Sequence, residues 1–253
     1  MSLVSVIMPA YNASKTIEQA IHSVLEQTVS EFELIVIDDC STDDTAEKIK
    51  ALSQNDERII VLTNDKNSGV AYSRNYGVSV AKGEWIAFLD SDDMWRKDKL
   101  EKQLELVNTN QQAVITYTAS SFVDWEGKPY NYIMPVDAIV DYKTLLRKNL
   151  LSCSSVMVKR DIMKNYKMPS DNMSEDYAVW LMILKDVGIA YGVNEPLLIY
   201  RLSKNSKSSS RIKAFRMHFN AYRYVGYNSL YSLFLTGLYT FYSIAKRKNI
   251  KEG

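Results

Sequence analysis

The sequence predicts one α/β domain with a mostly parallel central sheet flanked by helices, followed by a helical tail. Over the first 90 residues, short β-branched runs alternate with stretches of helical periodicity, which is the pattern of βαβ units. The chain of 253 residues is long enough for one large core and does not require two domains. We therefore expect a catalytic domain over residues 1–210 and a C-terminal amphipathic helical extension over residues 211–253.

Strands and helices of the first part follow from their apolar patterns. The predicted strands are Leu3–Met8, Phe32–Asp38, Ile59–Thr63 and Trp85–Leu89. Apolar residues between Ile17 and Leu25 recur at helical spacing, so a helix between the first two strands packs on the sheet. Ser41 and Asp44 resemble a capping box that begins the second helix. A third helix is expected after Gly69 and ends near Ala81.

The alternation of strands and helices is looser beyond Asp93. Further elements are predicted as a helix through Leu100, Leu104 and Val107, a strand at Ala113–Tyr117, a hairpin at Trp125–Pro129, a helix at Glu175–Val187, and strands at Ile189–Val193 and Leu197–Tyr200. The segment Ser203–Lys213 is rich in Ser and Lys, and we expect it to be a mobile boundary before the tail.

Composition excludes several classes of protein. Thirty-one Lys and Arg against 30 Asp and Glu give a net charge of +1, which does not favour nucleic-acid binding. Cys40 and Cys153 are too few for a disulfide framework and fit a reducing compartment. Met1–Ala10 has the pattern of a first strand and not of a signal peptide. We therefore expect a cytoplasmic protein.

The tail contains an uncharged stretch, Tyr224–Ala245, that is followed by Lys246, Arg247 and Lys248. Ser and Thr residues lie at helical spacing opposite Leu and Phe residues, so the helix is two-faced and does not resemble a transmembrane span. Its tyrosines and cations suit peripheral contact with the inner face of the cell membrane. Packing of its apolar face on the catalytic domain, or on a second subunit in a homodimer, is the alternative.

Acidic residues follow neighbouring predicted strands at the edge where ligands bind in open α/β sheets. Asp38 and Asp39 follow the second strand, and Asp90 and Asp92 follow the fourth. These carboxylates repel one another unless a cation is present, and a divalent cation with oxygen ligands would also recruit a nucleotide diphosphate. Helix capping is the plainer explanation for either pair alone.

Other catalytic motifs are missing from the sequence. It contains neither a G-x-G-x-x-G motif after the first strand nor a P-loop, which argues against a dinucleotide oxidoreductase and a P-loop enzyme. His22 and His218 are isolated and do not have the spacing of zinc ligands. Metal-dependent hydrolysis therefore has no support.

Several motifs, in this order, resemble the family-two inverting glycosyltransferases of GT-A fold. They are Val4–Asn12, Leu34–Asp39 with Ser41, Asn67-x-Gly69, Ser73-Arg74-Asn75-x-Gly77, Leu89–Asp93, Ser174-Glu175-Asp176-Tyr177-x-x-Trp180, and Tyr200-Arg201 with Ser206 and Ser208. The likeness is dense over residues 3–93 and covers about the first 210 residues. It implies transfer of a sugar from a nucleotide-diphosphate sugar, most simply a UDP-sugar, to a glycan or lipid-linked acceptor in bacterial polysaccharide synthesis.

The resemblance also implies roles for individual residues. The nucleotide-sugar-binding residues would be Pro9, Tyr11, Asp39, Asn67, Arg74, Asp90 and Ser91. Among these, Asp39 would accept a hydrogen bond from a pyrimidine ring N–H, and Asp90 would approach the ribose or the sugar. Asp92 would bind Mn²⁺ or Mg²⁺, which neutralises the charge of the leaving diphosphate.

Asp176 would be the general base of the family's acid pair, with Glu175 beside it. Without the resemblance, Asp176 is an ordinary first-turn acid that the helix dipole favours. One departure concerns Ser203, because relatives often have a histidine at this place that contacts the metal or the diphosphate. Lys204, Lys207 and Arg211 are nearby cations that could replace it.

Two functions from other classes are weighed against this interpretation. One is a catalytically silent carbohydrate-binding or nucleotide-sugar-binding module, which the presence of Asp39, Asp92 and Asp176 together disfavours. The other is a nucleotidyltransferase, but the sequence lacks the Lys- and Gly-rich N-terminal loop of such enzymes. The stretch Thr118–Asp171 is the variable part on which the choice of sugar, acceptor and linkage would depend.

Overall fold

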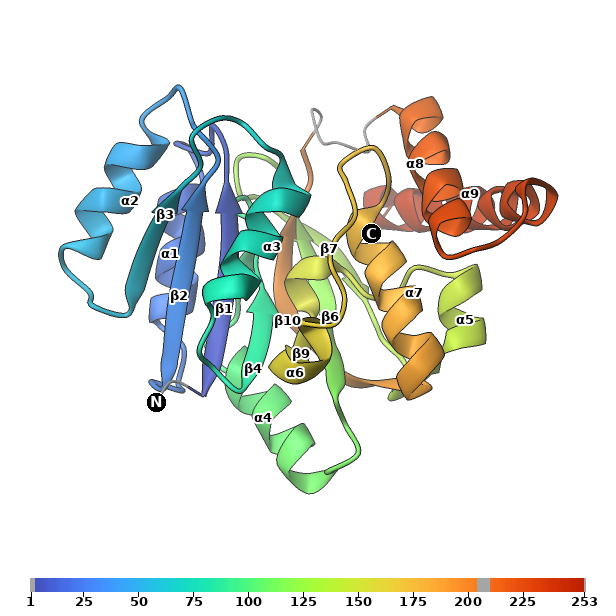
Figure 1. Cartoon of the computed structure of the whole chain (residues 1–253), viewed down its shortest axis with the longest axis horizontal. Coiled ribbons are helices and arrows are strands. Elements are labelled where there is room, and N and C mark those ends of the chain that lie inside the picture. The colour runs from blue at the N-terminus through green and yellow to red at the C-terminus, as the bar shows by residue number, and fades with distance from the viewer. Residues whose placement is uncertain (1–2, 204–209, 253) are drawn as a thin grey trace.

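The computed structural model describes residues 3–203 and 210–252 of the chain. Its strands form one twisted sheet in the order β3-β2-β1-β4-β9-β6-β10-β5, with β7 paired to β6 and β8 paired to β10 (Figure 1). The strands are β1 Val4–Ala10, β2 Phe32–Asp38, β3 Ile59–Thr63, β4 Trp85–Phe88, β5 Met94–Trp95, β6 Ile115–Val123, β7 Pro129–Met134, β8 Ile139–Asp141, β9 Met157–Lys159 and β10 Ile189–Arg201. The predicted α/β class is confirmed.

The first four strands pair with one another only in parallel, as predicted. β1 lies between β2 and β4, and the register Ala10↔Asp38 brings the carboxyl ends of β1 and β2 to one level. Antiparallel pairs appear in the second half of the sheet, where β9 pairs with both β4 and β6. The parallel half therefore supplies the edge at which the polar strand ends gather.

Helices cover both faces of the sheet. They are α1 Ile17–Leu25, α2 Thr45–Ser53, α3 Val70–Val80, α4 Lys99–Thr109, α5 Tyr142–Arg147, α6 Arg160–Met163, α7 Glu175–Val187, α8 Arg211–Tyr224 and α9 Ser229–Glu252, with a 3₁₀ turn at Cys153–Ser155. Alternate residues of β1 face opposite cores, because a strand points successive side chains to opposite sides. Ile7 packs in the core beneath α3 and α7, whereas Val6 and Met8 pack in the core beneath α1 and α4.

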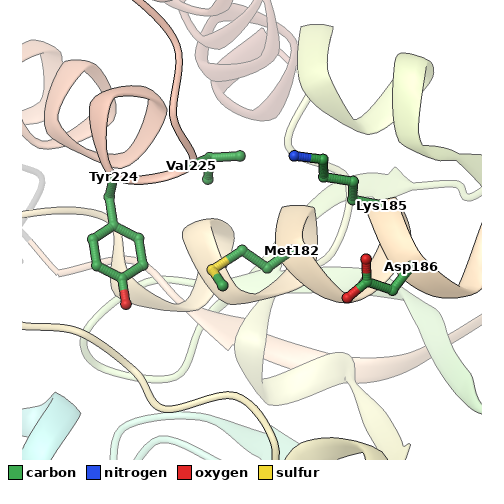
Figure 2. A pocket seen from close by; sticks show the side chains of 5 residues that line it. All are labelled: Met182, Lys185, Asp186, Tyr224 and Val225. Atoms are coloured by element: carbon green, nitrogen blue, oxygen red, sulfur yellow. The ribbon is translucent and has the colours of Figure 1, made fainter.

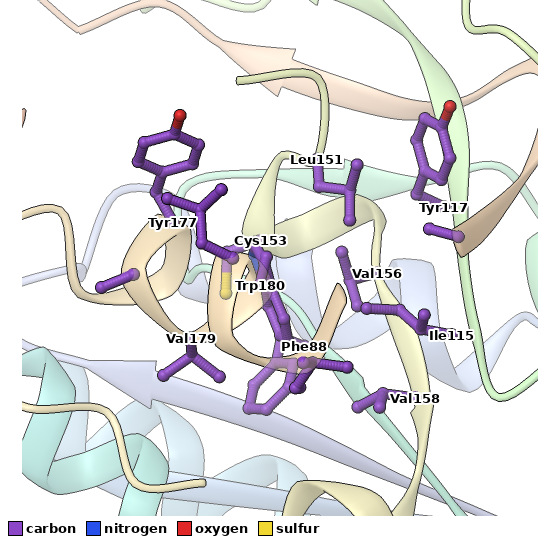
Figure 3. Packing of buried hydrophobic residues seen from close by; sticks show 14 of the residues in the cluster. Phe88, Ile115, Tyr117, Leu151, Cys153, Val156, Val158, Tyr177, Val179 and Trp180 are labelled. Atoms are coloured by element: carbon purple, nitrogen blue, oxygen red, sulfur yellow. The ribbon is translucent and has the colours of Figure 1, made fainter. Parts of the chain in front are cut away.

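The core on the α7 side is built around Trp180. Its ring lies 5.9 Å from the ring of Phe88 on β4, measured between centroids, and both side chains are fully buried. Figure 3 shows Trp180 beside Phe88, with Tyr177 one turn earlier on the same helix. This packing fixes α7 against the end of β4. The acidic run Asp90–Asp93 follows that end.

Three local predictions differ from the structure. Ser41 and Asp44 form no capping box for α2, because the Ser41 hydroxyl accepts a hydrogen bond from the Asn12 amide at 3.0 Å and Asp44 makes no side-chain cap bond. The strand expected at Ala113–Tyr117 is β6, which extends to Val123. The two strands expected after α7 are the single strand β10, whose pairing with β6 is irregular around Pro196.

The expected hairpin is confirmed. β6 and β7 are antiparallel neighbours, and the Asp124 amide donates to the Lys128 carbonyl at 2.9 Å across the turn between them. Gly127 has φ of +89°, a conformation that favours glycine.

The tail forms α8 and α9, and α9 turns its polar side inward and its apolar side outward. Ser232 and Thr236 are fully buried, whereas Leu230 and Phe241 are 83% and 79% exposed. The alternative in which the apolar face packs on the catalytic domain is therefore wrong for this chain. Ala221 and Tyr222 of α8 join the same core as Trp180, so the tail shares the core of the domain before it. Within the described residues, no helix is both long and apolar enough to cross a membrane.

Candidate active site

The predicted site residues gather where β1, β2 and β4 end. Asp39 follows β2, Tyr11 follows β1, and Asp90 to Asp93 follow β4, and these three strands are neighbours in the sheet. The acids after β2 and β4 therefore lie at one edge of the sheet, as predicted, with the end of β1 between them. The start of α7, with Glu175 and Asp176, lies across from them, because both Asp90 and Glu175 contact one arginine.

Pro9 and Tyr11 occupy the end of β1. Pro9 is buried within the strand, whereas Tyr11 is 47% exposed and leaves its ring open to a flat ligand. Asn12 has φ of +48° and its side-chain carbonyl accepts from the Thr42 amide at 2.8 Å, so the turn after β1 is held by the loop after β2. The turn that follows Tyr11 is therefore held in place by a second loop.

Asp39 is buried and holds a loop of its own chain. Its carboxylate accepts from the side-chain amide of Asn64 at 2.7 Å, the Ser68 amide at 2.8 Å and the Gly69 amide at 2.7 Å. One lone pair of Oδ2 remains for the expected pyrimidine N–H, since each carboxylate oxygen accepts two bonds. Sequence reasoning missed Asn64, which also donates to Ser73 at 2.9 Å. Asn67 is exposed on the same loop.

The start of α3 is capped from a distant part of the chain. The Asp171 carboxylate accepts from the Val70 and Ala71 amides at 2.9 Å each, which satisfies two amides at the helix N-terminus. Gly69 has φ of +89°, and a Cβ at this position would lie 2.2 Å from Asp171 Oδ2. The Asn67-x-Gly69 motif is thus explained by the close approach of Asp171.

Arg74 is the central cation of the site and is only 4% exposed. Its Nη2 lies 2.5 Å from Asp90 Oδ1, and its Nη1 lies 3.0 Å from Glu175 Oε1. Burial acts to lower the pKa of Arg74, but the charges of Asp90 and Glu175 outweigh it and raise that pKa well above its usual value. Arg74 therefore joins the end of β4 to the start of α7. Its partners in the structure are acids, whereas the sequence led us to expect that it binds the nucleotide-sugar.

Asp176 stands beside this ion-pair network and is partly exposed. Burial and the neighbouring charge of Glu175 raise the pKa of Asp176 to about 6, although Arg74 and the Tyr177 amide oppose the shift. The Tyr177 amide donates to Asp176 Oδ1 at 2.7 Å. Asp176 is therefore an accessible carboxylate that is ionised at neutral pH and close to its protonation range.

Asp92 and Asp93 are held by Arg201, a residue for which the sequence indicated no role. The Arg201 Nε donates to the Asp92 carbonyl at 2.9 Å, and the Arg201 amide donates to Asp93 Oδ1 at 2.9 Å. Burial and the charge of Asp90 raise the pKa of Asp92 to about 6. Ser91, between the two acids that were expected to bind the donor and the metal, is half-buried.

The chemistry of these carboxylates fits a divalent cation. The ion pairs among the described residues do not include Asp92, and its carboxylate is destabilised by burial and by the nearby Asp90. No group of three or more His, Cys, Asp or Glu side chains in the described part could enclose a metal. Asp92 and Asp90 thus offer a site that a ligand phosphate would complete, which is how Mg²⁺ is commonly bound.

Ser203 stands where relatives often have a histidine, and the structure describes only part of the surrounding segment. Ser203 is half-buried after β10, and Arg211 is exposed at the start of α8. Lys204 and Lys207, which could replace the histidine, lie outside the described residues together with Ser206 and Ser208.

His218 of α8 fastens the tail to the start of α7. Its Nδ1 lies 2.9 Å from the Ser174 hydroxyl, and its ring stacks on Tyr239 of α9 at 3.6 Å between centroids. The Ser174 amide also donates to the Met217 carbonyl at 3.2 Å. Burial lowers the pKa of His218 to about 4, so it is neutral at pH 7. Its role is structural, because it supports the residue immediately before Glu175.

A shallow pocket elsewhere on the molecule carries none of this chemistry. Figure 2 shows its lining side chains: Met182, Lys185, Asp186, Tyr224 and Val225. It lies between the second half of α7 and the end of α8, away from Asp176 at the first turn of α7. The site at the strand ends is therefore the better candidate.

Comparison with known proteins identifies relatives over most of the chain. The family model described as Glycosyl transferase family 2 matches residues 5–166. The putative teichuronic acid biosynthesis glycosyltransferase TuaG of Bacillus subtilis (strain 168) is 41% identical over 221 residues, which cover 87% of this chain and 87% of that protein. The UDP-Glc:alpha-D-GlcNAc-diphosphoundecaprenol beta-1,3-glucosyltransferase WfgD of Escherichia coli is 38% identical over 213 residues, covering 83% of this chain and 81% of that protein.

Solved structures share the fold. The crystal structure of S. aureus TarS 1-349 in complex with UDP-GlcNAc superposes with a TM-score of 0.73 at 20% identity, covering 92% of this chain and 69% of that chain. This likeness confirms the GT-A architecture that the sequence motifs implied.

Replacement of Arg74 by Met tests whether the buried ion pairs hold the site together. The change leaves Asp90 and Glu175 without their cation, so we expect the free energy of unfolding at pH 7 to fall by about 3 to 5 kcal/mol. Urea denaturation followed by circular dichroism measures it. The control is Lys102→Met, which removes an exposed pair with Glu105 and should cost less than about 1 kcal/mol. Equal effects of the two changes would contradict the role given to Arg74.

Proposed function

The chain belongs to glycosyl transferase family 2, and from this premise we propose that it transfers a sugar from a UDP-sugar to a lipid-linked glycan with inversion at the anomeric carbon. The observation that carries the proposal is the pair of contacts from Arg74 to Asp90 and Glu175, which brings donor-side and base-side acids into one site. Among relatives, WfgD is named as using UDP-Glc and a GlcNAc-diphosphoundecaprenol.

Asp176 is proposed as the general base. A base near the operating pH is the most effective, and the pKa of Asp176 is raised to about 6. Glu175 is 5% exposed and paired with Arg74, so it is better suited to hold the site than to meet an acceptor. The Asp176 carboxylate would accept the proton of the acceptor hydroxyl as that oxygen attacks the anomeric carbon.

Departure of the nucleotide takes place on the other face of the sugar. We propose that Asp92, with Asp90, holds Mn²⁺ or Mg²⁺, and a bound cation would supply charge neutralisation to the leaving diphosphate. Arg201 keeps the Asp92 backbone in place for this purpose through its 2.9 Å bond to the carbonyl.

The nucleotide would lie over the ends of β1 and β2. We propose that the exposed Tyr11 ring stacks on the base, with Pro9 beneath it and Asn67 and Ser91 at the edges of the donor. Asp39 shapes this pocket by holding the loop of Asn64 to Gly69 and offers its remaining lone pair to the pyrimidine N–H. Arg74 acts on the donor indirectly, by fixing Asp90.

The place of action follows from the proposed acceptor. A lipid-linked sugar keeps its lipid in a membrane, so we propose that the enzyme acts at the inner membrane face. The C-terminal extension, residues 211–253, is proposed as its contact with that membrane or with a second copy of the chain. The alternatives of a silent binding module and a nucleotidyltransferase have no specific observation in their favour, since the relatives named above are glycosyltransferases.

The metal assignment predicts that UDP binds more tightly in the presence of Mn²⁺ or Mg²⁺. Isothermal titration calorimetry should show a dissociation constant at least about tenfold larger in EDTA, because the cation links the carboxylates to the phosphates. In Asp92→Ala the metal should make no difference. The control Asp98→Ala, an acidic residue before α4, should behave as the wild type. Equal affinity for UDP with and without metal in the wild type would refute the assignment.

The base assignment predicts that Asp176→Asn keeps donor affinity and lowers kcat by about a hundredfold to ten-thousandfold. Wild-type kcat should also fall as the pH drops below about 6, since the carboxyl then carries the proton that it must accept. Turnover is measured with a panel of UDP-sugars and a synthetic GlcNAc-diphospho-lipid.

Two variants separate chemistry from folding in this experiment. Asp186→Asn changes an acid on the same helix that binds Tyr166 and should keep wild-type kcat. Glu175→Gln should lower stability more than Asp176→Asn does, because it disturbs the pair with Arg74. Near-normal turnover of folded Asp176→Asn protein would show that another residue is the base.

A further inference from the structure

Helix α9 exposes a row of large apolar side chains along its length. We call this row the α9 apolar face, and it consists of Leu230, Leu233, Phe234, Leu238, Phe241 and Ile244. Phe234 is 58% exposed and the others range from 41% to 83%. Soluble monomers rarely expose a contiguous apolar surface of this kind unless it binds something.

The rotation of α9 about its axis is fixed by its buried side. The Thr236 and Thr240 hydroxyls donate to carbonyls four residues earlier at 2.7 and 2.8 Å, so these polar groups are satisfied within the helix when they face inward. Leu235 is buried on the same side, and Tyr239 stacks on His218. Turning the apolar face inward would break these contacts, so its exposure belongs to the folded state.

Charge is distributed unevenly along the chain. Residues 211–253 contain eight Lys and Arg against the single acid Glu252, which gives this segment a charge of +7 in a chain whose total is +1. The preceding 210 residues therefore carry −6. Arg211, Lys213, Arg216 and Arg223 are exposed on α8, which packs beside α9.

Apolar and cationic groups meet where α8 and α9 touch. Arg211, Ile212, Phe215 and Thr240 line a shallow groove between the two helices. Ile212 is among the most exposed apolar residues of the described chain and adds an apolar side chain on α8. Two helices in contact thus expose apolar side chains on α9 and cations on α8, the two features of helices that lie in a membrane interface.

We propose that the α9 apolar face, with the cations of α8, binds the surface of a bilayer that contains anionic lipids. The apolar side chains enter the boundary of the acyl chains, and the cations remain among the headgroups. A second copy of the chain fits this surface less well, because two segments of +7 would repel each other across it.

Membrane binding through this face would bring the catalytic end of the molecule to the lipid. α8 is tied to the residues before α7 through the contact of His218 with Ser174 and a 2.9 Å bond from Asn220 to the Asn172 carbonyl. Figure 1 shows α8 and α9 together beside the start of α7. This consequence rests on the proposed function, since a lipid-linked acceptor would then meet Asp176 at the membrane, whereas lipid binding itself does not depend on catalysis.

Co-sedimentation of the full chain with vesicles tests the proposal without any sugar transfer. Vesicles of phosphatidylcholine alone are compared with vesicles that also contain phosphatidylglycerol, at low and high salt. We expect binding to the anionic vesicles that weakens at high salt. The double change Phe234→Ser and Phe241→Ser should weaken it at least about tenfold, because both rings lose their burial in lipid. The control Ile139→Ser alters an equally exposed apolar residue on β8 and should leave binding unchanged.

Other outcomes would overturn the proposal. If neither vesicle type binds the chain, or if the double variant with an unchanged urea midpoint binds as the wild type does, the α9 apolar face is not a lipid-binding surface. Sedimentation-velocity ultracentrifugation is run in parallel on the same proteins. A dimer that the double change dissociates, in a chain that does not bind vesicles, would assign the face to a second copy.

Discussion

A single buried cation unites the two halves of the site. Arg74 extends from α3 to Asp90 at the end of β4 and to Glu175 at the start of α7, elements that are 16 and 101 residues away along the chain. Its burial requires both carboxylates, because a buried guanidinium without partners is strongly destabilising. The carboxylates in turn stand close to Asp92 and Asp176, and burial together with the negative charge of Asp90 or Glu175 raises the pKa values of these two residues to about 6. Structure and electrostatics of the site thus depend on one side chain.

The surrounding chain supports this arrangement from several sides. Asp171 caps the helix that carries Arg74, Arg201 holds the loop that carries Asp92, and His218 supports the residue before Glu175. Each contact joins segments far apart in sequence, and the last comes from the C-terminal tail. The tail is therefore connected both to the acids and, through α9, to the proposed lipid surface. Membrane contact and catalysis would share one rigid support.

The sequence predicted the parallel half of the sheet well, because βαβ alternation and the acids after β2 and β4 are local patterns. It also indicated that the acids after β2 and β4 would lie at one edge of the sheet. It did not predict the partners of Arg74, the cap formed by Asp171 or the role of Asn64, since these contacts depend on tertiary packing between distant segments. The capping box at Ser41 failed for the same reason, because Asn12 engages that hydroxyl. The two faces of α9 were identified correctly, but the sequence left open which of them faces outward. The structure exposes the apolar face, since Thr hydroxyls can be satisfied within their own helix.

The central claim is a direct displacement in which a base on one face of the sugar opposes the leaving diphosphate on the other. The anomeric configuration of the product tests it most directly. The product formed from a UDP-sugar and a GlcNAc-diphospho-lipid is analysed by proton NMR, and the coupling constant of the new anomeric proton gives its configuration. The account predicts a configuration opposite to that of the donor. Retention of the donor configuration would contradict the account, because it requires a different course at the anomeric carbon.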